Sequence, residues 1–127
     1  MVVDASKEDL LIGVCGAGAM GRGIVQVASV GGVRVKVFDI NKEQLEEAFK
    51  FIDNMLGRAV EKGRMQQEAR QDAVSRIELV GGISDLSDCE IVIEAATENL
   101  EIKKKIFAEI EDVVSDNTII ATNTSSL

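Results

Sequence analysis

The chain has 127 residues, a length typical of one domain, and its 46% hydrophobic and 28% charged residues are an ordinary globular balance. Its formal net charge is −8, because 14 Lys and Arg are outnumbered by 22 Asp and Glu, and this charge argues against nucleic acid and anionic membranes as partners. The chain contains no histidine, so no imidazole is available here as a general base or metal ligand, and we expect no metal site.

Two further features bear on location. The first nine residues are acidic and polar, and no apolar run approaches the roughly 20 residues that cross a bilayer, so we expect neither a signal peptide nor a membrane span. Cys15 and Cys89 lie far apart in the sequence without metal-like partners, which favours reduced thiols in a cytoplasmic protein. A buried small hydrophobic role is the simplest interpretation of each cysteine.

The first third of the chain reads as strand, helix, strand. Residues 10–15 form a continuous apolar run, which is typical of a strand buried on both faces. Glycines follow, and apolar residues then recur at helical spacing up to Gly31 and Gly32, a good helix stop. Residues 33–38 alternate apolar and polar side chains, many of them β-branched, and predict a second strand that ends at Asp39.

The middle of the chain predicts a long helix and a short one. Asn41 is a candidate N-cap, and Gly63 ends the periodic stretch. Residues 66–75 predict a further short helix. The long helix has one amphipathic face, expected to pack in the core, formed by Leu45, Ala48, Phe49, Ile52, Leu56, Ala59 and Val60.

The last third predicts two strands, a helix and a final strand. Residues 77–80 and 91–93 are short apolar strands, separated by a turn-rich loop over 81–88, and the second of them ends at Glu94. Residues 118–121 predict the last strand. Between them, an amphipathic helix should bury Leu100, Ile106, Phe107, Ile110, Val113 and Val114, with Lys103, Lys104, Glu109 and Glu111 mostly on other faces.

Strands that alternate with helices imply parallel pairing through right-handed crossovers. Because the strands are apolar on both faces and the helices on one, the sheet should be covered on both sides. The sequence therefore predicts an α/β, Rossmann-type doubly wound sheet with strand order 3-2-1-4-5, folded as one domain over residues 1–127.

The motif Gly-x-Gly-x-x-Gly stands between the first strand and the first helix, and Asp39 ends the second strand at the spacing of a dinucleotide-binding unit. The first glycine allows a tight turn, the second lets a pyrophosphate approach the backbone, and the third lets the helix pack closely. The helix N-terminus attracts the phosphates, and Asp39 accepts ribose hydroxyls and repels a 2′-phosphate, which predicts NAD rather than NADP. The motif residues are Gly16, Ala17, Gly18, Ala19, Met20 and Gly21. The alternative is a glycine turn that binds nothing.

Four sequence blocks resemble a known family. Gly-Ala-Gly-Ala-Met-Gly-Arg-Gly-Ile, Val-Phe-Asp-Ile, Val-Ile-Glu-Ala-Ala-Thr-Glu-Asn-Leu and Ala-Thr-Asn-Thr-Ser-Ser-Leu are similar, in this order, to the N-terminal NAD-binding domain of 3-hydroxyacyl-CoA dehydrogenases, including 3-hydroxybutyryl-CoA dehydrogenases. The similarity covers nearly all of residues 10–127. It implies oxidation of a 3-hydroxyacyl-CoA to a 3-oxoacyl-CoA by hydride transfer to NAD, or the reverse, as in fatty acid metabolism.

The resemblance also implies roles for individual residues. Asp39 would hold the adenosine ribose, and Ala95 and Ala96 would line the cofactor cleft. Glu98 and Lys103 would contact the nicotinamide side, and Ser125 would contact both the nicotinamide end and the substrate oxygen. Asn123 would shape the end of the last strand. Lys62 falls where family members contact coenzyme A, but Met55 stands where they can carry a serine.

The chain departs from the family in one respect. The family uses a histidine paired with a glutamate as its base, C-terminal to the serine motif, together with a helical domain for substrate contacts and dimerisation. Without a histidine, this chain is expected to be a fragment of a longer, dimeric enzyme and to bind NAD with little turnover. Another NAD-dependent β-hydroxyacid dehydrogenase and a stand-alone nucleotide-binding regulatory module are the alternatives.

Overall fold

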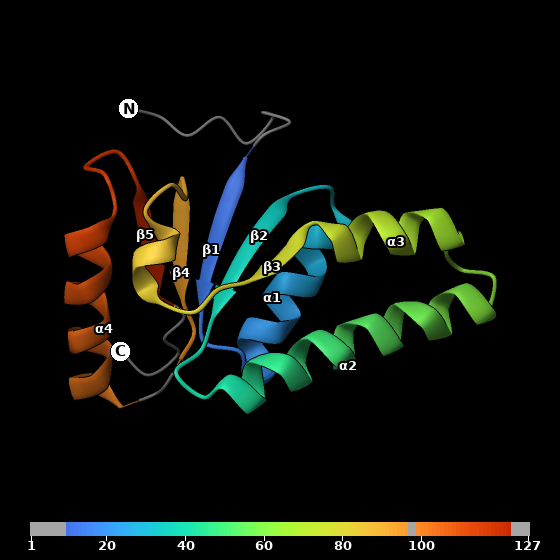
Figure 1. Cartoon of the computed structure of the whole chain (residues 1–127), viewed down its shortest axis with the longest axis horizontal. Helices are drawn as coiled ribbons and strands as arrows, with labels where there is room; N and C mark the ends of the chain where they lie inside the picture. The colour runs from blue at the N-terminus through green and yellow to red at the C-terminus, as the bar shows by residue number, and fades with distance from the viewer. Residues whose placement is uncertain (1–9, 97–98, 123–127) are drawn as a thin grey trace.

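The computed structural model describes residues 10–96 and 99–122 (Figure 1). Strands and helices alternate along the chain in the predicted order. The elements are β1 (Leu11–Cys15), α1 (Ala19–Val30), β2 (Arg34–Phe38), α2 (Lys42–Glu61), α3 (Gln67–Ser75), β3 (Ile77–Leu79), the 3₁₀ turn η1 (Ile83–Leu86), β4 (Ile91–Glu94), α4 (Leu100–Val113) and β5 (Ile119–Thr122).

The sheet has the predicted topology. Its order is β3-β2-β1-β4-β5, and all four pairings are parallel. The chain moves outward from β1 in one direction and then returns to β1 and moves outward in the other. The change of direction between β1 and β4 is the place where ligands bind in open sheets of this type.

Helices cover both faces of the sheet. Figure 1 shows α1, α2 and α3 on one side and α4 with η1 on the other. Strand β1 alternates between the two layers, because Val14 belongs to the first core while Leu11 and Cys15 belong to the second. The buried residues of the first core are Val14, Ala17, Val25, Val35, Val37, Leu45, Ala48, Ile52, Leu56, Ala73 and Ile77, and those of the second are Leu11, Cys15, Val80, Leu86, Cys89, Val92 and Ile110.

Helix α2 begins where the sequence predicts. The Asn41 side chain accepts a hydrogen bond from the backbone N–H of Gln44 at 3.1 Å, which caps the first turn. Its predicted apolar face is confirmed, since Leu45, Ala48, Ile52 and Leu56 are buried and Phe49, Ala59 and Val60 are half-buried.

Two expectations need correction. The predicted loop over 81–88 contains η1, and its Leu86 is fully buried in the second core. The Lys36 ammonium also ties this segment to β2, through the Asp85 carbonyl at 3.0 Å and the Asp88 carboxylate at 2.9 Å. On α4 the predicted face is wrong at two positions: Leu100 is 52% exposed, whereas Lys103 is only 5% exposed. Helical spacing alone cannot show that Lys103 has a buried acidic partner.

Within residues 10–96 and 99–122, no helix has the length and apolar character needed to cross a membrane. The same residues contain no group of three or more Cys, Asp or Glu side chains placed to hold a metal ion.

Candidate functional site

The carboxyl ends of the central strands are level with one another. In the parallel register, Cys15 lies between Phe38 of β2 and Glu94 of β4, and Glu94 pairs with Thr122 of β5. The chain segments that follow Cys15, Phe38 and Glu94 therefore leave the sheet at one edge. This edge collects the glycine loop, Asp39 and the Ala95–Ala96 segment, as the sequence predicts.

Gly16 fits a place that no other residue could occupy without strain. Its φ is +115°, and an added Cβ would lie 2.5 Å from the Cα of Ala96 and 2.7 Å from the carbonyl carbon of Ala95. Its N–H donates to the Phe38 carbonyl at 2.7 Å, and the Ala95 N–H donates to the Cys15 carbonyl at 2.8 Å. The glycine loop is thus packed directly on the segment that follows β4.

Gly21 makes the second close approach. A Cβ here would lie 1.7 Å from the carbonyl oxygen of Gly16, which is backbone and cannot move aside without moving the loop. At Gly18, by contrast, one heavy atom of the described residues lies within 4 Å of an added Cβ, namely the side-chain nitrogen of Gln44, at 3.8 Å. Space is therefore open over the middle glycine, where the motif predicts the pyrophosphate.

The N-terminus of α1 differs from those of α2 and α4. Both of those helices are capped by asparagine side chains, Asn41 and Asn99, which accept backbone N–H groups of their first turns. Helix α1 is capped by Gly18, makes no side-chain cap hydrogen bond and has no acidic residue in its first turn. Its N–H groups and the positive end of its dipole are left for an anion.

Asp39 is held firmly beside this helix. Its Oδ2 accepts hydrogen bonds from the Ala17 N–H and from Gln44 Nε2, both at 2.8 Å, and its Oδ1 accepts the Asn41 N–H at 2.7 Å. All three donors are neutral groups, so none of these bonds pairs the carboxylate with a cation. Ala17 itself is buried, and its N–H binds Asp39, whereas Ala19 and Met20 are exposed at the start of α1.

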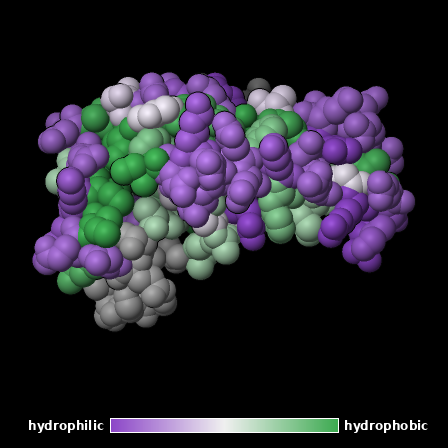
Figure 2. Space-filling view, turned by 60° about the horizontal axis from the view of Figure 1, so that its bottom comes forward, coloured by the Kyte–Doolittle hydropathy of each residue, from purple (hydrophilic) through white to green (hydrophobic). Residues whose placement is uncertain are grey.

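A cavity of about 470 Å³ opens next to Asp39 on the β4 side. Two polar side chains, Asp39 and Gln44, meet there with the glycine loop, and Lys105 and Glu109 approach from α4. Its remaining lining is Cys15, Gly16, Phe38, Ile40, Ile83, Ala96, Ile102 and Ile106. Figure 2, in which the carboxyl-end edge comes forward, shows hydrophobic surface on the α4 side with hydrophilic side chains around it.

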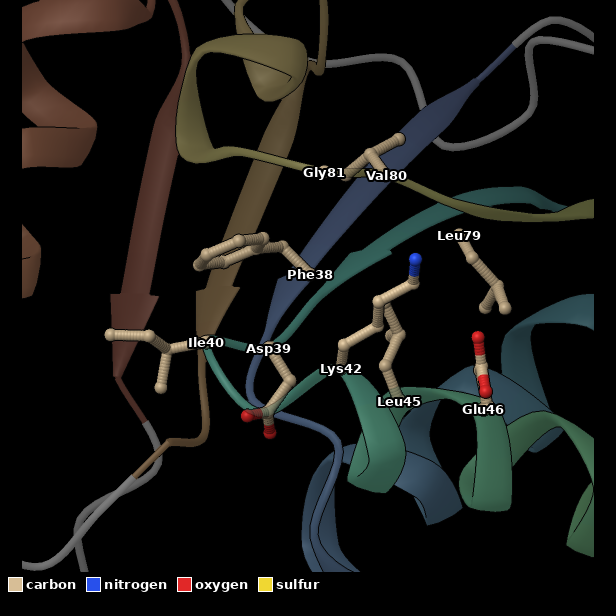
Figure 3. A pocket seen from close by; sticks show the side chains of 9 residues that line it. All are labelled: Phe38, Asp39, Ile40, Lys42, Leu45, Glu46, Leu79, Val80 and Gly81. Atoms are coloured by element: carbon tan, nitrogen blue, oxygen red, sulfur yellow. The ribbon is translucent and has the colours of Figure 1, made fainter.

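A second cavity, of about 480 Å³, lies on the other side of Asp39, toward β3 (Figure 3). Lys42 and Glu46 rise into it from α2, beneath Leu79 and Val80, while the Asp39 carboxylate points away from these two residues. None of its lining residues belongs to the glycine loop. The β4-side cavity is therefore the one that borders both the glycine loop, through Gly16, and the Asp39 carboxylate.

Glu94, the last residue of β4, is completely buried. Its Oε1 accepts hydrogen bonds from Lys103 Nζ at 2.8 Å and from Thr122 Oγ1 at 2.9 Å, and its Oε2 accepts the Ala96 N–H at 2.7 Å. Burial raises the pKa of the Glu94 carboxyl, but these three hydrogen bonds outweigh that effect and leave the pKa below its ordinary value. One carboxylate thus ties together β4, β5, α4 and the segment after β4.

The remaining predicted residues divide into two groups. Glu98, Asn123 and Ser125 lie outside the described residues. Lys62 and Met55 are described, but α2 is 20 residues long, so Lys62 lies about 30 Å along the helix from the Asp39 end. The structure therefore does not bring Lys62 into the nucleotide cavity.

Both cysteines are free thiols, and both are buried. Burial raises the pKa of each to about 12, with the Glu94 and Asp39 carboxylates adding to the effect at Cys15 and Asp88 adding to it at Cys89. Such thiols stay protonated near neutral pH and are weak nucleophiles.

Sequence reasoning missed three features of this edge: the Gln44 amide on Asp39, the buried Glu94 network and the almost fully exposed Ile40 at the cavity rim. Ile40 carried a usable signal, since an isoleucine directly after a strand-ending acid stands outside any apolar periodicity. Gln44 and Glu94 act through contacts between separate elements, and no local pattern reports them.

Fold and site together define a dinucleotide-binding domain of the Rossmann type. The family model for the "3-hydroxyacyl-CoA dehydrogenase, NAD binding domain" matches residues 11–127. The chain belongs to this family, so its cofactor is NAD.

Similar proteins carry names consistent with the family. A 3-hydroxybutyryl-CoA dehydrogenase of Bradyrhizobium diazoefficiens is 40% identical over 116 residues, which cover 91% of this chain and 40% of that protein. A probable 3-hydroxyacyl-CoA dehydrogenase of Caenorhabditis elegans is 42% identical over 120 residues, covering 90% of this chain and 39% of the relative. This chain thus spans about two fifths of the length of these relatives.

Solved structures agree with the fold. The crystal structure of (S)-3-hydroxybutyryl-CoA dehydrogenase from Ralstonia eutropha superposes with a TM-score of 0.89 at 38% identity, over 92% of this chain and 41% of that one. The 3-hydroxybutyryl-CoA dehydrogenase of Escherichia coli gives a TM-score of 0.90 at 37% identity, over 94% of this chain and 25% of that one.

Proposed function

We propose that NAD binds across the carboxyl-end edge between β1, β2 and β4. The uncapped N-terminus of α1 would hold the pyrophosphate over Gly18, and Asp39 would accept ribose hydroxyls. The β4-side cavity would take the adenine between the apolar side chains of Ile40 and Ile102. The observation that carries this proposal is the pairing of a helix N-terminus without a side-chain cap with a carboxylate held beside it by neutral donors.

The whole protein, we further propose, oxidises a 3-hydroxyacyl-CoA to the 3-oxoacyl-CoA, or catalyses the reverse. NAD, when bound, supplies the hydride acceptor. From the family resemblance, Ser125 would contact the substrate oxygen, and Asn123 would shape the strand end beside it. Glu98 would hold the nicotinamide half together with Lys103, whose ammonium also binds Glu94 at 2.8 Å. The names of the similar dehydrogenases support this reaction class.

We propose that coenzyme A is recognised near the C-terminal end of α2. Lys62 is exposed at the C-terminal end of this helix, and Met55, 38% exposed, lies two turns earlier on a similar face. Lys62 would supply a cation for the phosphates of coenzyme A. In a full-length enzyme that contains this domain, Lys62→Ala should raise the KM for the acyl-CoA and leave the KM for NAD unchanged.

Calorimetric titration with NAD⁺ and NADP⁺ tests the cofactor assignment. We expect NAD⁺ to bind and NADP⁺ to bind far more weakly, because the 2′-phosphate would face the Asp39 carboxylate. Asp39→Ala should narrow the difference between the two cofactors. Equal binding of both by the unaltered chain would contradict the role of Asp39, and binding of neither would contradict the site.

A turnover assay tests whether the catalytic base lies outside these 127 residues. The 127-residue chain has no histidine to act as base, so we expect it to bind NAD(H) but to reduce acetoacetyl-CoA at least 10²–10⁴-fold more slowly than a full-length dehydrogenase. Comparable turnover would show that the base lies within these residues. We also propose that the full enzyme is a cytoplasmic homodimer, to be checked by cell fractionation and sedimentation.

A further inference from the structure

We propose that Gln44 is a recognition residue for the adenosine ribose, and that it acts together with Asp39. The inference rests on NAD binding at this edge and adds a side chain that neither the motif nor the family resemblance singles out. Its starting point is the 2.8 Å hydrogen bond from Gln44 Nε2 to Asp39 Oδ2.

Asp39 alone cannot accept hydrogen bonds from both ribose hydroxyls, so a second acceptor is needed. A carboxylate offers about four lone-pair positions, two on each oxygen. Both positions on Oδ2 are occupied, by the Ala17 N–H and by Gln44 Nε2, and one on Oδ1 is occupied by the Asn41 N–H. One acceptor position is left, whereas a ribose presents two hydroxyl groups that each donate a proton.

Gln44 supplies the missing acceptor. Its Nε2 must face the Asp39 carboxylate, since an amide oxygen there would be repelled, and this fixes the orientation of the amide. Its Oε1 then has no hydrogen-bond partner among the described residues, and it belongs to the same amide group as the Nε2 that binds Asp39. The side chain lines the β4-side cavity, and Nε2 comes within 3.8 Å of a Cβ placed on Gly18.

The backbone holds Gln44 in this position. Its N–H is fixed by the side chain of Asn41 at 3.1 Å, so the first turn of α2 is ordered before any ligand arrives. The side chain itself is exposed and packs in neither core, so its replacement should leave the fold intact. An amide oxygen accepts from a hydroxyl but repels the oxygens of a phosphate, so Gln44 would favour the same cofactor as Asp39.

The test compares Gln44→Met with the unaltered chain by calorimetry, using NAD⁺, 2′-deoxyadenosine NAD⁺ and 3′-deoxyadenosine NAD⁺. Gln67→Met, an exposed glutamine on α3 that lines neither cavity beside Asp39, is the matched control. One hydrogen bond contributes about 0.5–1.5 kcal/mol net, so Gln44→Met should weaken NAD⁺ binding by about 2- to 10-fold and Gln67→Met should not. For the deoxy analogue that lacks the hydroxyl held by Gln44, the two chains should bind equally.

Gln44→Glu provides a second variant of the same shape. It replaces the donor on Asp39 by a second carboxylate, and repulsion between the two ionised groups should weaken NAD⁺ binding more at pH 8 than at pH 5. NAD⁺ binding unchanged in Gln44→Met, or a loss of equal size for NAD⁺ and both deoxy analogues, would overturn the inference. Failure of the unaltered chain to bind NAD⁺ would instead contradict the proposed function.

Discussion

Two carboxylates mark the ends of the strands on either side of β1, and they are built for different tasks. Asp39 follows β2, and Glu94 ends β4. Each carboxylate accepts three hydrogen bonds. One donor to Asp39 is the Ala17 N–H in the loop after β1, and one donor to Glu94 is the Ala96 N–H in the segment after β4. Asp39 is half-buried at the cavity and has only neutral donors, whereas Glu94 is fully buried and paired with the Lys103 ammonium.

The difference lies in what remains after the internal bonds are made. Asp39 has no cation among the three donors bonded to it, keeps one acceptor position and lines the β4-side cavity. Glu94 has its charge neutralised at 2.8 Å and has no contact with solvent. In this domain, the acid that we propose to serve a ligand has only neutral donors, whereas the acid that ties four elements together is buried with a cation.

Glu94→Gln should give the largest effect on stability. It leaves a buried ammonium without this carboxylate, and breaking such a pair costs about 3–5 kcal/mol in the free energy of unfolding. Urea denaturation followed by circular dichroism measures the loss. Glu111→Gln, on the exposed side of α4, changes the net charge equally and should cost almost nothing. The double variant Glu94→Gln/Lys103→Met should recover part of the loss, and equal losses in both single glutamate variants would refute the structural role of Glu94.

Asp39→Asn should weaken NAD⁺ binding strongly and lower the free energy of unfolding only slightly. A hydrogen bond to a charged group contributes about 1.5–3 kcal/mol, so NAD⁺ affinity measured by calorimetry should fall by about 10- to 100-fold. The free energy of unfolding should fall by no more than about 1.5 kcal/mol, because no buried cation is left behind. A destabilisation as large as that of Glu94→Gln would erase the contrast between the two acids.

Thr122→Val should give a smaller effect in the Glu94 network. It removes one of three donors to Glu94 while the Lys103 bond remains, so a loss of about 1 kcal/mol is expected in urea denaturation. Thr122→Ser keeps the hydroxyl and serves as the control. Equal stability of the valine variant and the unaltered chain would show that this donor contributes nothing measurable.

The smallest effect is expected in how the Glu94 contribution to the free energy of unfolding changes at acidic pH. The folded pKa of Glu94 lies below its ordinary value of 4.5, so the contribution of Glu94 to stability is complete above that pH and is lost as the pH falls through the folded pKa. The gap in unfolding free energy between the unaltered chain and Glu94→Gln should therefore narrow below pH 4.5. Denaturation curves at several acidic pH values measure it, and a gap that widens in acid would reverse the assigned shift.

Sequence reasoning predicted the architecture because each element carries its own local signal. The apolar run before Gly16, the cap at Asn41 and the acid at Asp39 are all readable within a few residues, and the strand order follows from connection rules. The loop over 81–88 was not predicted to contribute Leu86 to the core, and Lys103 in α4 was placed on the wrong face, because both side chains are buried through contacts with other elements. Predicting them requires knowledge of which side chains meet across the sheet.

The close approach of Gly21 to the Gly16 carbonyl has a consequence for how the domain tolerates variation. Every amino acid other than glycine has a Cβ, so any substitution at position 21 would clash with the Gly16 carbonyl and should be selected against. Gly23, two residues further along the same helix, has no heavy atom of the described residues within 4 Å of an added Cβ. Within one helix, variation over generations should therefore retain the first glycine and tolerate a small side chain such as alanine at the second.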